Sequence, residues 1–231
     1  MNFLCHAMPY LDQPLLAIST GVPDWLSVVD RKIRARGKLA AQHIDSDDEE
    51  LRLVAAGVIR HIEDDRWFHG TQSFIETNMR LAMQLRDLLP GDAGFRPTFV
   101  GHILIEMLLD AFWIRDDPSI GDRYYQAVAD CDSKTVQRCV NQITGRPTDA
   151  LAGVIDRFTE IRFLYDYLDN AKMLMRLNQV MKRVGLAELP VAVGDWLPAA
   201  SELVESRRVR LLSPPDASNP FPPIETPKET N

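Results

Sequence analysis

Metal-binding residue types recur at four-residue spacing in two places, and they are the clearest chemical signal in this chain. The two groups are His61, Asp65 and His69, and His102, Glu106 and Asp110. On a helix, residues four apart share one face, with Cβ atoms about 5–6 Å apart. Imidazoles and carboxylates suit zinc, iron, manganese or nickel. Random placement of these residue types would give only about 0.1–0.2 such groups in the whole chain.

The second group lies in the stretch GHILIEMLLDAFWI, which is otherwise apolar apart from Gly101. Burying an ionisable group without a partner costs several kcal/mol, so these side chains must be paired or bound to something. The competing interpretation is an ordinary helix-stabilising pair of His with Asp or Glu, which applies most readily to the first group alone. We predict that the two groups are facing walls of one metal site.

Two further candidate ligands lie near the start of the chain. His6 sits between apolar neighbours, where a histidine is often simply part of the core. Asp24 follows Pro23 at a predicted helix start, where a carboxylate also interacts favourably with the helix dipole. A divalent transition metal, as one or two ions of Mn, Fe, Ni or Zn, is the predicted cofactor. The predicted metal residues are His6, Asp24, His61, Asp65, His69, His102, Glu106 and Asp110.

The elements that must position these residues are all predicted to be helical. Apolar residues recur with helical period, Pro and Gly punctuate the chain, and no hairpin signal is present. We expect a single-domain, all-α bundle of about 8–10 helices over residues 1–211, with the metal site between central helices. The longest expected helices cover 49–69, 71–89, 97–115 and 149–184. The Pro-rich segment 212–231 is expected to be disordered.

Composition narrows the class of protein. The 231 residues carry a net charge of −7 with no dominant basic stripe, which argues against nucleic acid as a partner. Cys5, Cys131 and Cys139 have no CxxC spacing and indicate reduced thiols. No signal peptide is recognised, and no apolar run reaches 18 residues, so a cytoplasmic protein without membrane spans is expected. The oligomeric state stays open.

Several motifs resemble the bacterial acyl-carrier-protein phosphodiesterase family. They are the opening MNFLCH, the Gly21–Trp25 turn, Gly57-x-x-x-His61-x-x-x-Asp65, and Glu106 with Asp110 followed by Phe112. The match covers about residues 1 to 115. It implies an all-α fold related to HD-type metal phosphohydrolases and hydrolysis of a phosphodiester. It also implies His6, Asp24, His61, Asp65 and Asp110 as metal-site residues.

The chain departs from that family at several positions. Ile62 and Glu63 stand where the family has two arginines, and Phe68-His69 replaces a threonine-aspartate pair. Ala111 replaces a histidine, whereas His102 is an addition. Arginines beside a metal ordinarily hold phosphate, so these changes leave the identity of the phosphoester, whether a small molecule or protein-linked, open.

The chemistry that such a site favours is metal-assisted hydrolysis. A divalent ion lowers the pKa of bound water toward 7, and a carboxylate takes its proton. The predicted catalytic carboxylates are Asp65, Glu106 and Asp64. The predicted phosphate contacts are Arg60, Arg66, Arg162 and Lys172.

Two alternatives remain. A di-iron, oxygen-activating enzyme also uses His and carboxylates on facing helices, although the usual Glu-x-x-His spacing accompanies neither group here. The other is a metal-binding helical protein without a substrate.

Overall fold

Helices are the only regular structure in the part of the chain that the structure describes. The computed structural model describes residues 1–89, 91, 94–215 and 219–224, and no β-strand occurs within those ranges. The expected all-α class is therefore confirmed. The elements in chain order are α1 (Phe3–Ala7), η1 (Met8–Tyr10), α2 (Pro14–Ser19), α3 (Val22–Val29), α4 (Gly37–Ala40), η2 (Ala41–His43), α5 (Glu49–Gly70), α6 (Gln72–Leu88), α7 (Pro97–Asp116), α8 (Pro118–Asp130), α9 (Ser133–Thr144), α10 (Leu151–Ile161), η3 (Phe163–Leu168), α11 (Asn170–Arg183), α12 (Ala192–Glu205) and α13 (Arg208–Leu211).

The two long helices that carry the metal-ligand patterns have well-defined ends. Asp48 caps α5, because its carboxylate accepts a hydrogen bond from the backbone N–H of Leu51. The α7 helix begins with Pro97, whose missing N–H costs nothing in the first turn. It ends where Asp117 caps the next helix by accepting from the N–H of Ser119. Local sequence therefore sets the length of both walls of the site.

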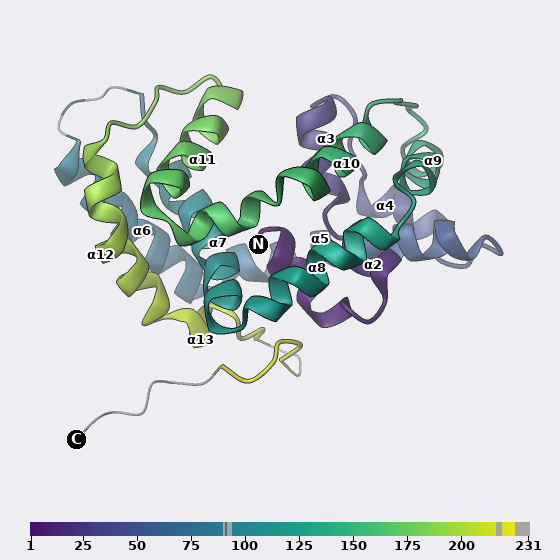
Figure 1. Ribbon diagram of the computed structural model, residues 1–231, viewed down its shortest axis with the longest axis horizontal. Helices are drawn as coiled ribbons and strands as arrows, with labels where there is room; N and C mark the ends of the chain where they lie inside the picture. Colours follow the sequence, from purple (N-terminus) through teal and green to yellow (C-terminus); the bar gives the residue numbers. More distant parts are fainter. Residues whose placement is uncertain (90, 92–93, 216–218, 225–231) are drawn as a thin grey trace.

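The short helix α1 connects these two walls. It packs against both α5 and α7, and also against α2 and α8. The α5 helix further contacts α2, α3, α4 and α9, whereas α7 contacts α6, α8, α11, α12 and η3. Figure 1 shows the N-terminus near the centre of the molecule, between the half that contains α3 and α10 and the half that contains α11 and α12. The start of the chain thus lies in the interior.

The expected continuous helix over 149–184 is wrong, because the structure divides it into α10, η3 and α11. The break occurs at Arg162, which adopts the left-handed conformation with φ 50°. The hydroxyl of Tyr125 then accepts a hydrogen bond from the N–H of Leu164, and Asp169 caps α11. Tertiary contacts therefore override a pattern that would otherwise propagate as one helix. Further along the chain, α12 ends at Glu205 and the short helix α13 begins at Arg208.

Part of the Pro-rich segment 212–231 contacts the domain. Phe221 is buried, and its ring stacks on Trp113 with centroids 6.1 Å apart. Residues 216–218 and 225–231 of this segment lie outside the described residues, so its expected disorder stays a prediction.

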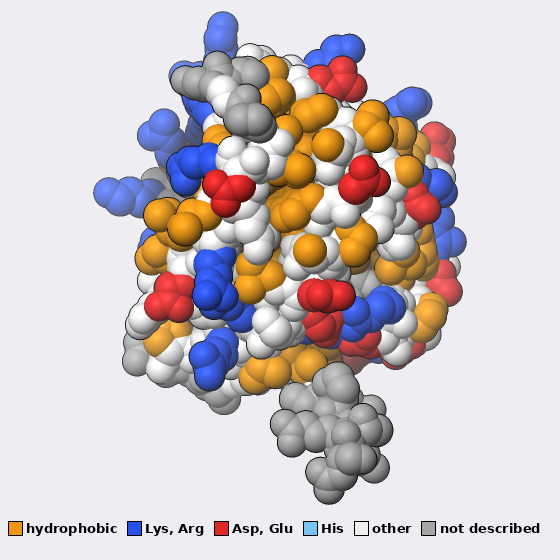
Figure 2. Space-filling view, turned by 90° about the vertical axis from the view of Figure 1, so that its left-hand side faces the viewer, with side chains coloured by type: hydrophobic (Ala, Val, Ile, Leu, Met, Phe, Trp, Pro, Cys, Tyr) orange, Lys and Arg blue, Asp and Glu red, His pale blue; other side chains and the backbone are white. Residues whose placement is uncertain are grey.

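Three features of the structure bear on the expectations drawn from composition: the burial of α7, the state of the cysteines and the distribution of surface charge. The α7 helix is long and apolar enough to cross a membrane, but 67% of its apolar window is buried among other helices, as in a core helix. Cys5, Cys131 and Cys139 form no disulfide. On the face formed by α6, α11 and α12, basic and acidic side chains are interspersed with hydrophobic ones (Figure 2).

Candidate metal centre

The first cluster joins α1 to α5. His6, His61 and Asp65 offer ligand atoms that all lie within 4.8 Å of one another. The two imidazole rings stack, with centroids 4.2 Å apart, and the Nε2 atoms of His6 and His61 lie 3.3 Å and 3.4 Å from the Asp65 carboxylate. Two imidazoles and one carboxylate form a donor set that can hold a metal ion.

The outer nitrogens of these histidines are held by other groups. Nδ1 of His61 lies 2.8 Å from the carbonyl oxygen of Thr20, and Nδ1 of His6 lies 3.3 Å from Oδ2 of Asp64. The carbonyl oxygen of Thr20 can only accept, so Nδ1 of His61 carries the hydrogen and Nε2 of His61 keeps its lone pair toward Asp65. Burial, followed by the charge of His6, lowers the pKa of His61 to about 3. His61 is therefore neutral at pH 7, which is the form that binds metals.

One buried nitrogen in this cluster has no hydrogen-bond partner. Nε2 of His6 is fully buried, and its approach to Asp65 does not have hydrogen-bond geometry, so within the described residues it is unsatisfied. Leaving a buried polar atom without a partner is costly. A metal ion at the point shared by His6, His61 and Asp65 would satisfy it.

The second cluster joins α5 to α7. His69, His102 and Glu106 again place their ligand atoms within 4.8 Å of one another. Nε2 of His69 lies 2.8 Å from Oε1 of Glu106, and Nε2 of His102 lies 3.2 Å from the same oxygen. His69, near the end of α5, thus meets His102 and Glu106 of α7, as predicted. This cluster is less buried than the first.

The α-amino group of Met1 lies between the two clusters and contacts one carboxylate of each. Its nitrogen lies 2.6 Å from Oδ1 of Asp65 and 3.2 Å from Oε1 of Glu106. Burial alone would lower the pKa of this amine, but Glu106 and Asp65 raise it to about 11. Burial would likewise raise the pKa values of both carboxyls, yet this amine and the neighbouring histidines hold them below their usual range. The centre therefore stabilises positive charge, and a metal ion would compete with the amine.

Asp110 has a different role from the predicted one. Its two carboxylate oxygens accept hydrogen bonds from the backbone N–H groups of Leu4 and Cys5, at 3.1 Å and 2.9 Å. These are donors of the first turn of α1, and Asn2 at the N-cap provides no side-chain bond to them. Asp110 thus caps α1 from α7 and fixes the position of His6. Helical spacing placed it on the face of Glu106, but it lies one turn further along, beneath α1.

Replacing Asp110 with asparagine should destabilise the protein by about 1–3 kcal/mol, because one of two buried N–H donors loses its charged acceptor. Metal content should fall as well, since His6 is no longer held. Urea unfolding and elemental analysis measure the two effects. Asp117→Asn is the matched control, because Asp and Asn are similar caps on the exposed start of α8. Equal losses in both variants would contradict this role for Asp110.

Asp24, on α3, borders the centre without being part of either cluster. Its carboxylate makes no hydrogen bond or ion pair with any residue that the structure describes. Burial raises its pKa from 3.8 to about 7, and the negative charges of Glu106 and Asp65 act in the same direction, against His6. Asp64, a predicted catalytic carboxylate, instead contacts Nδ1 of His6 through Oδ2. Its Oδ1 accepts a hydrogen bond from Nε1 of Trp67.

The raised pKa of Asp24 predicts a pH dependence. Because the folded state holds this proton more tightly than the unfolded state, the associated stability is present below about pH 4 and is lost as the pH rises through about 7. Without metal, the unfolding free energy of the wild type minus that of Asp24→Asn should therefore fall from pH 4 to 7. Added Mn²⁺ should flatten this difference, because a cation favours the carboxylate. A flat difference without metal would contradict the prediction.

A pocket of about 350 Å³ opens beside the centre. Asp24 and Glu106 line it, together with apolar side chains from α3, α7, α10 and η3. Its basic residues are Arg157, Arg176 and Arg183, none of which the sequence singled out. Arg176 pairs with Asp166, at 2.5 Å. The side chains of Arg157 and Arg183 have no hydrogen-bond or ion-pair partner in the described part of the chain.

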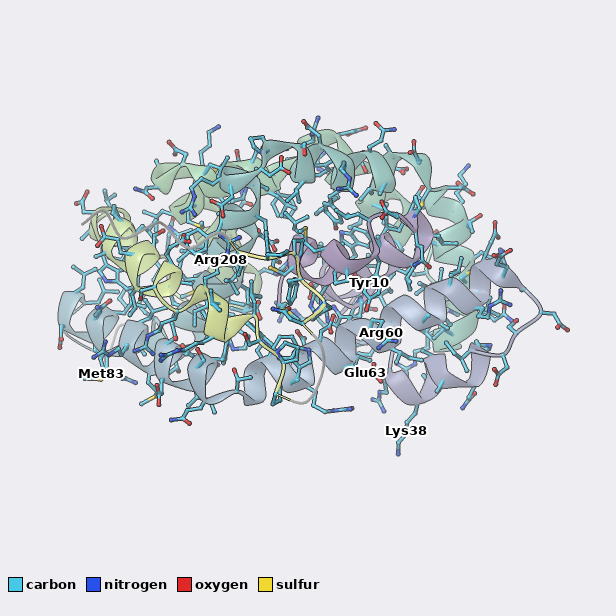
Figure 3. All side chains as sticks on the ribbon, turned by 90° about the horizontal axis from the view of Figure 1, so that it is seen from below. Tyr10, Lys38, Arg60, Glu63, Met83 and Arg208 are labelled. Atoms are coloured by element: carbon cyan, nitrogen blue, oxygen red, sulfur yellow. The ribbon has the colours of Figure 1, made fainter. Side chains whose placement is uncertain are left out.

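The four predicted phosphate contacts lie elsewhere. Arg60, Arg66, Arg162 and Lys172 do not line this pocket. Arg60 pairs with exposed Glu63 on α5, and the two lie side by side in Figure 3. Arg162 binds Asp122 and stacks over Tyr125 and Tyr165. No sequence pattern distinguishes pocket arginines from other arginines on amphipathic helices, because which helices border the pocket is a tertiary property.

Comparisons with known protein families, with curated proteins and with solved structures found no match for this chain. The resemblance to acyl-carrier-protein phosphodiesterases and the HD-like topology therefore stay predictions.

Proposed function

We propose that this protein is a metal-dependent phosphohydrolase that holds one or two divalent transition-metal ions in the two clusters. The first ion would bind His6, His61 and Asp65, and the second would bind His69, His102 and Glu106. Carboxylates of the two clusters face one point, which suits a two-ion site whose ions are about 3.5–4 Å apart. A bound ion supplies an activated water at neutral pH.

The residues around the ions have separate roles in this proposal. Asp24 accepts a proton from the attacking water, because it faces the pocket and has no partner of its own among the described residues. Thr20 and Asp64 keep the Nδ1 hydrogens of His61 and His6, and thereby orient the two rings. Asp110 positions His6 through α1.

The main support for this proposal is the set of residues that line the pocket next to the metal centre. Glu106 belongs to the second cluster and also to the pocket wall, which bears the unpaired cations Arg157 and Arg183. A substrate in the pocket would thus contact both metal-side carboxylates and arginines. Arginine suits a phosphoryl group because its fork of N–H donors matches phosphate oxygens.

A hydrolysis assay with reconstituted protein tests this function. Protein stripped with EDTA and dialysed is supplied with Mn²⁺, Fe²⁺, Ni²⁺ or Zn²⁺, and release of p-nitrophenol is followed from p-nitrophenyl phosphate and bis-p-nitrophenyl phosphate. We expect turnover with at least one ion and none in the stripped protein. No turnover with any ion on either ester would overturn the proposal.

A second candidate function is oxygen activation by iron. It is favoured by one specific feature: both clusters consist of two histidines and one carboxylate, a set that non-haem iron oxygenases use. Loading with Fe²⁺ under nitrogen followed by exposure to air distinguishes the two functions. Oxygen uptake with new visible absorption would favour this candidate, whereas Mn²⁺- or Zn²⁺-supported hydrolysis would favour the first.

A further inference from the structure

The pocket beside the metal centre is predominantly apolar away from its metal end. Its walls come from α3, α7, α10, α11 and η3, and include Trp25, Ile103, Met107, Val154 and Phe158. In Figure 1, α11 lies to the left of α3 and α10, and the N-terminus lies lower, between them. Val28 and Ile161 also line the pocket and remain 47% and 43% exposed. Apolar surface therefore continues from the interior to the rim.

Charge in the pocket is arranged in a way that suits an anion with an apolar body. The acidic residues that line the pocket are Asp24 on α3 and Glu106, which belongs to the second cluster, while Arg157 on α10 and Arg183 on α11 supply positive charge. Burial lowers the pKa of Arg183, whereas the nearby charge of Asp24 raises it. Arg183 lines the same pocket as Asp24 and Glu106, so one anionic group in the pocket could meet both the arginine and an ion at the centre.

Resting on the proposed function, we infer that the substrate is an amphiphilic phosphoester, in which the phosphoryl group is esterified to an alcohol that carries an apolar chain. The phosphoryl oxygens meet Arg183 and Arg157 and the metal side of the pocket. The chain lies along the apolar wall toward Val28 and Ile161. In hydrolysis the water oxygen bonds to phosphorus as the ester P–O bond breaks, and the alcohol leaves with a proton that balances the one Asp24 takes from the water.

This assignment makes affinity depend on chain length. Each methylene that leaves water for an apolar wall strengthens binding by about fourfold at most. A chain of eight carbons has six more methylenes than a chain of two, so it should bind about 60-fold more tightly if half of the six are buried and about 4000-fold more tightly if all six are. A small or purely polar phosphoester would leave the apolar wall in contact with water and gain nothing from it.

Alkylphosphonic acids test the inference separately from catalysis, because their C–P bond is not hydrolysed. Isothermal titration calorimetry with Mn²⁺-loaded protein compares octylphosphonate with ethylphosphonate. Val28→Asp and Ile161→Asp should each lower octylphosphonate affinity at least tenfold and leave ethylphosphonate binding unchanged. Val191→Asp is the control, since Val191 is 80% exposed and outside the pocket. Arg183→Gln should weaken both ligands, and Arg60→Gln neither.

The outcomes separate this inference from the proposed function. Equal affinity for the two phosphonates, or no effect of the rim substitutions, would overturn the amphiphilic substrate even if p-nitrophenyl esters are hydrolysed. Chain-length-dependent binding by a protein that hydrolyses no phosphoester would support the pocket assignment and overturn the phosphohydrolase.

Discussion

Replacing Asp65 with alanine should lower kcat/KM for a phosphoester by about 1000-fold or more, which corresponds to about 4 kcal/mol of transition-state stabilisation. Asp65 is the one carboxylate of the first cluster, and it also faces the point shared with Glu106. Its removal leaves two buried imidazoles without the charge that attracts a cation. The assay is steady-state hydrolysis with saturating Mn²⁺, accompanied by circular dichroism to verify folding.

Two comparison variants sharpen this result. Glu63→Ala is the matched control, because Glu63 is an exposed carboxylate on the same helix whose partner is Arg60. It should retain nearly full activity. His69→Ala should lose less activity than Asp65→Ala, since the more deeply buried cluster stays complete. Activity of Asp65→Ala within tenfold of the wild type would remove the first cluster from the mechanism.

Gly57→Ala should destabilise the protein by about 2 kcal/mol or more and should also lower metal content. A Cβ at this position would lie 2.5 Å from Cβ of Ser19 and 2.8 Å from its carbonyl carbon, so α2 and α5 must separate. Overpacking of this kind typically costs about 1–3 kcal/mol, and Thr20 follows Ser19 directly. Moving that segment withdraws the Thr20 carbonyl from His61 one turn along α5.

The control for this substitution is Gly153→Ala. Gly153 also lies inside a helix, but nothing approaches its Cβ position within 4 Å. Alanine there should stabilise the protein by about 0.5–1 kcal/mol, because it restricts the unfolded chain and favours the helix. Thermal unfolding of both variants, with elemental analysis, gives the comparison. If the Gly57 variant is as stable as the Gly153 variant, the close contact of α2 with α5 does not shape the site.

Sequence periodicity predicted those parts of the site that depend on one helix at a time. The four-residue spacing placed His61 with Asp65 and His102 with Glu106, and the structure has both pairs on α5 and α7. Spacing within a helix cannot identify the neighbouring helix, however. Asp110 shares the spacing of Glu106, yet it faces the start of α1 rather than the clusters. The same limitation left the pocket arginines unrecognised.

The break in the predicted 149–184 helix has a related cause. Helix ends are usually marked by Gly, Pro or a capping residue, but this helix ends at Arg162, a non-glycine residue in the left-handed region. Its guanidinium stacks on Tyr125 and Tyr165, and these contacts stabilise the left-handed backbone conformation. The residues next to Arg162 in the sequence give no indication of it. The break lets α11 turn toward the pocket, where it contributes Arg183.

Metal content is the most direct measurement of the central claim. Protein purified without chelator, together with His61→Ala and His102→Ala, is analysed by inductively coupled plasma mass spectrometry after dialysis. The two-cluster centre predicts nearly stoichiometric Mn, Fe, Ni or Zn in the wild type and a partial loss in each variant, because each removes one ligand of one cluster. A wild-type protein that carries none of these ions, and takes none up when each is supplied, would contradict the metal centre.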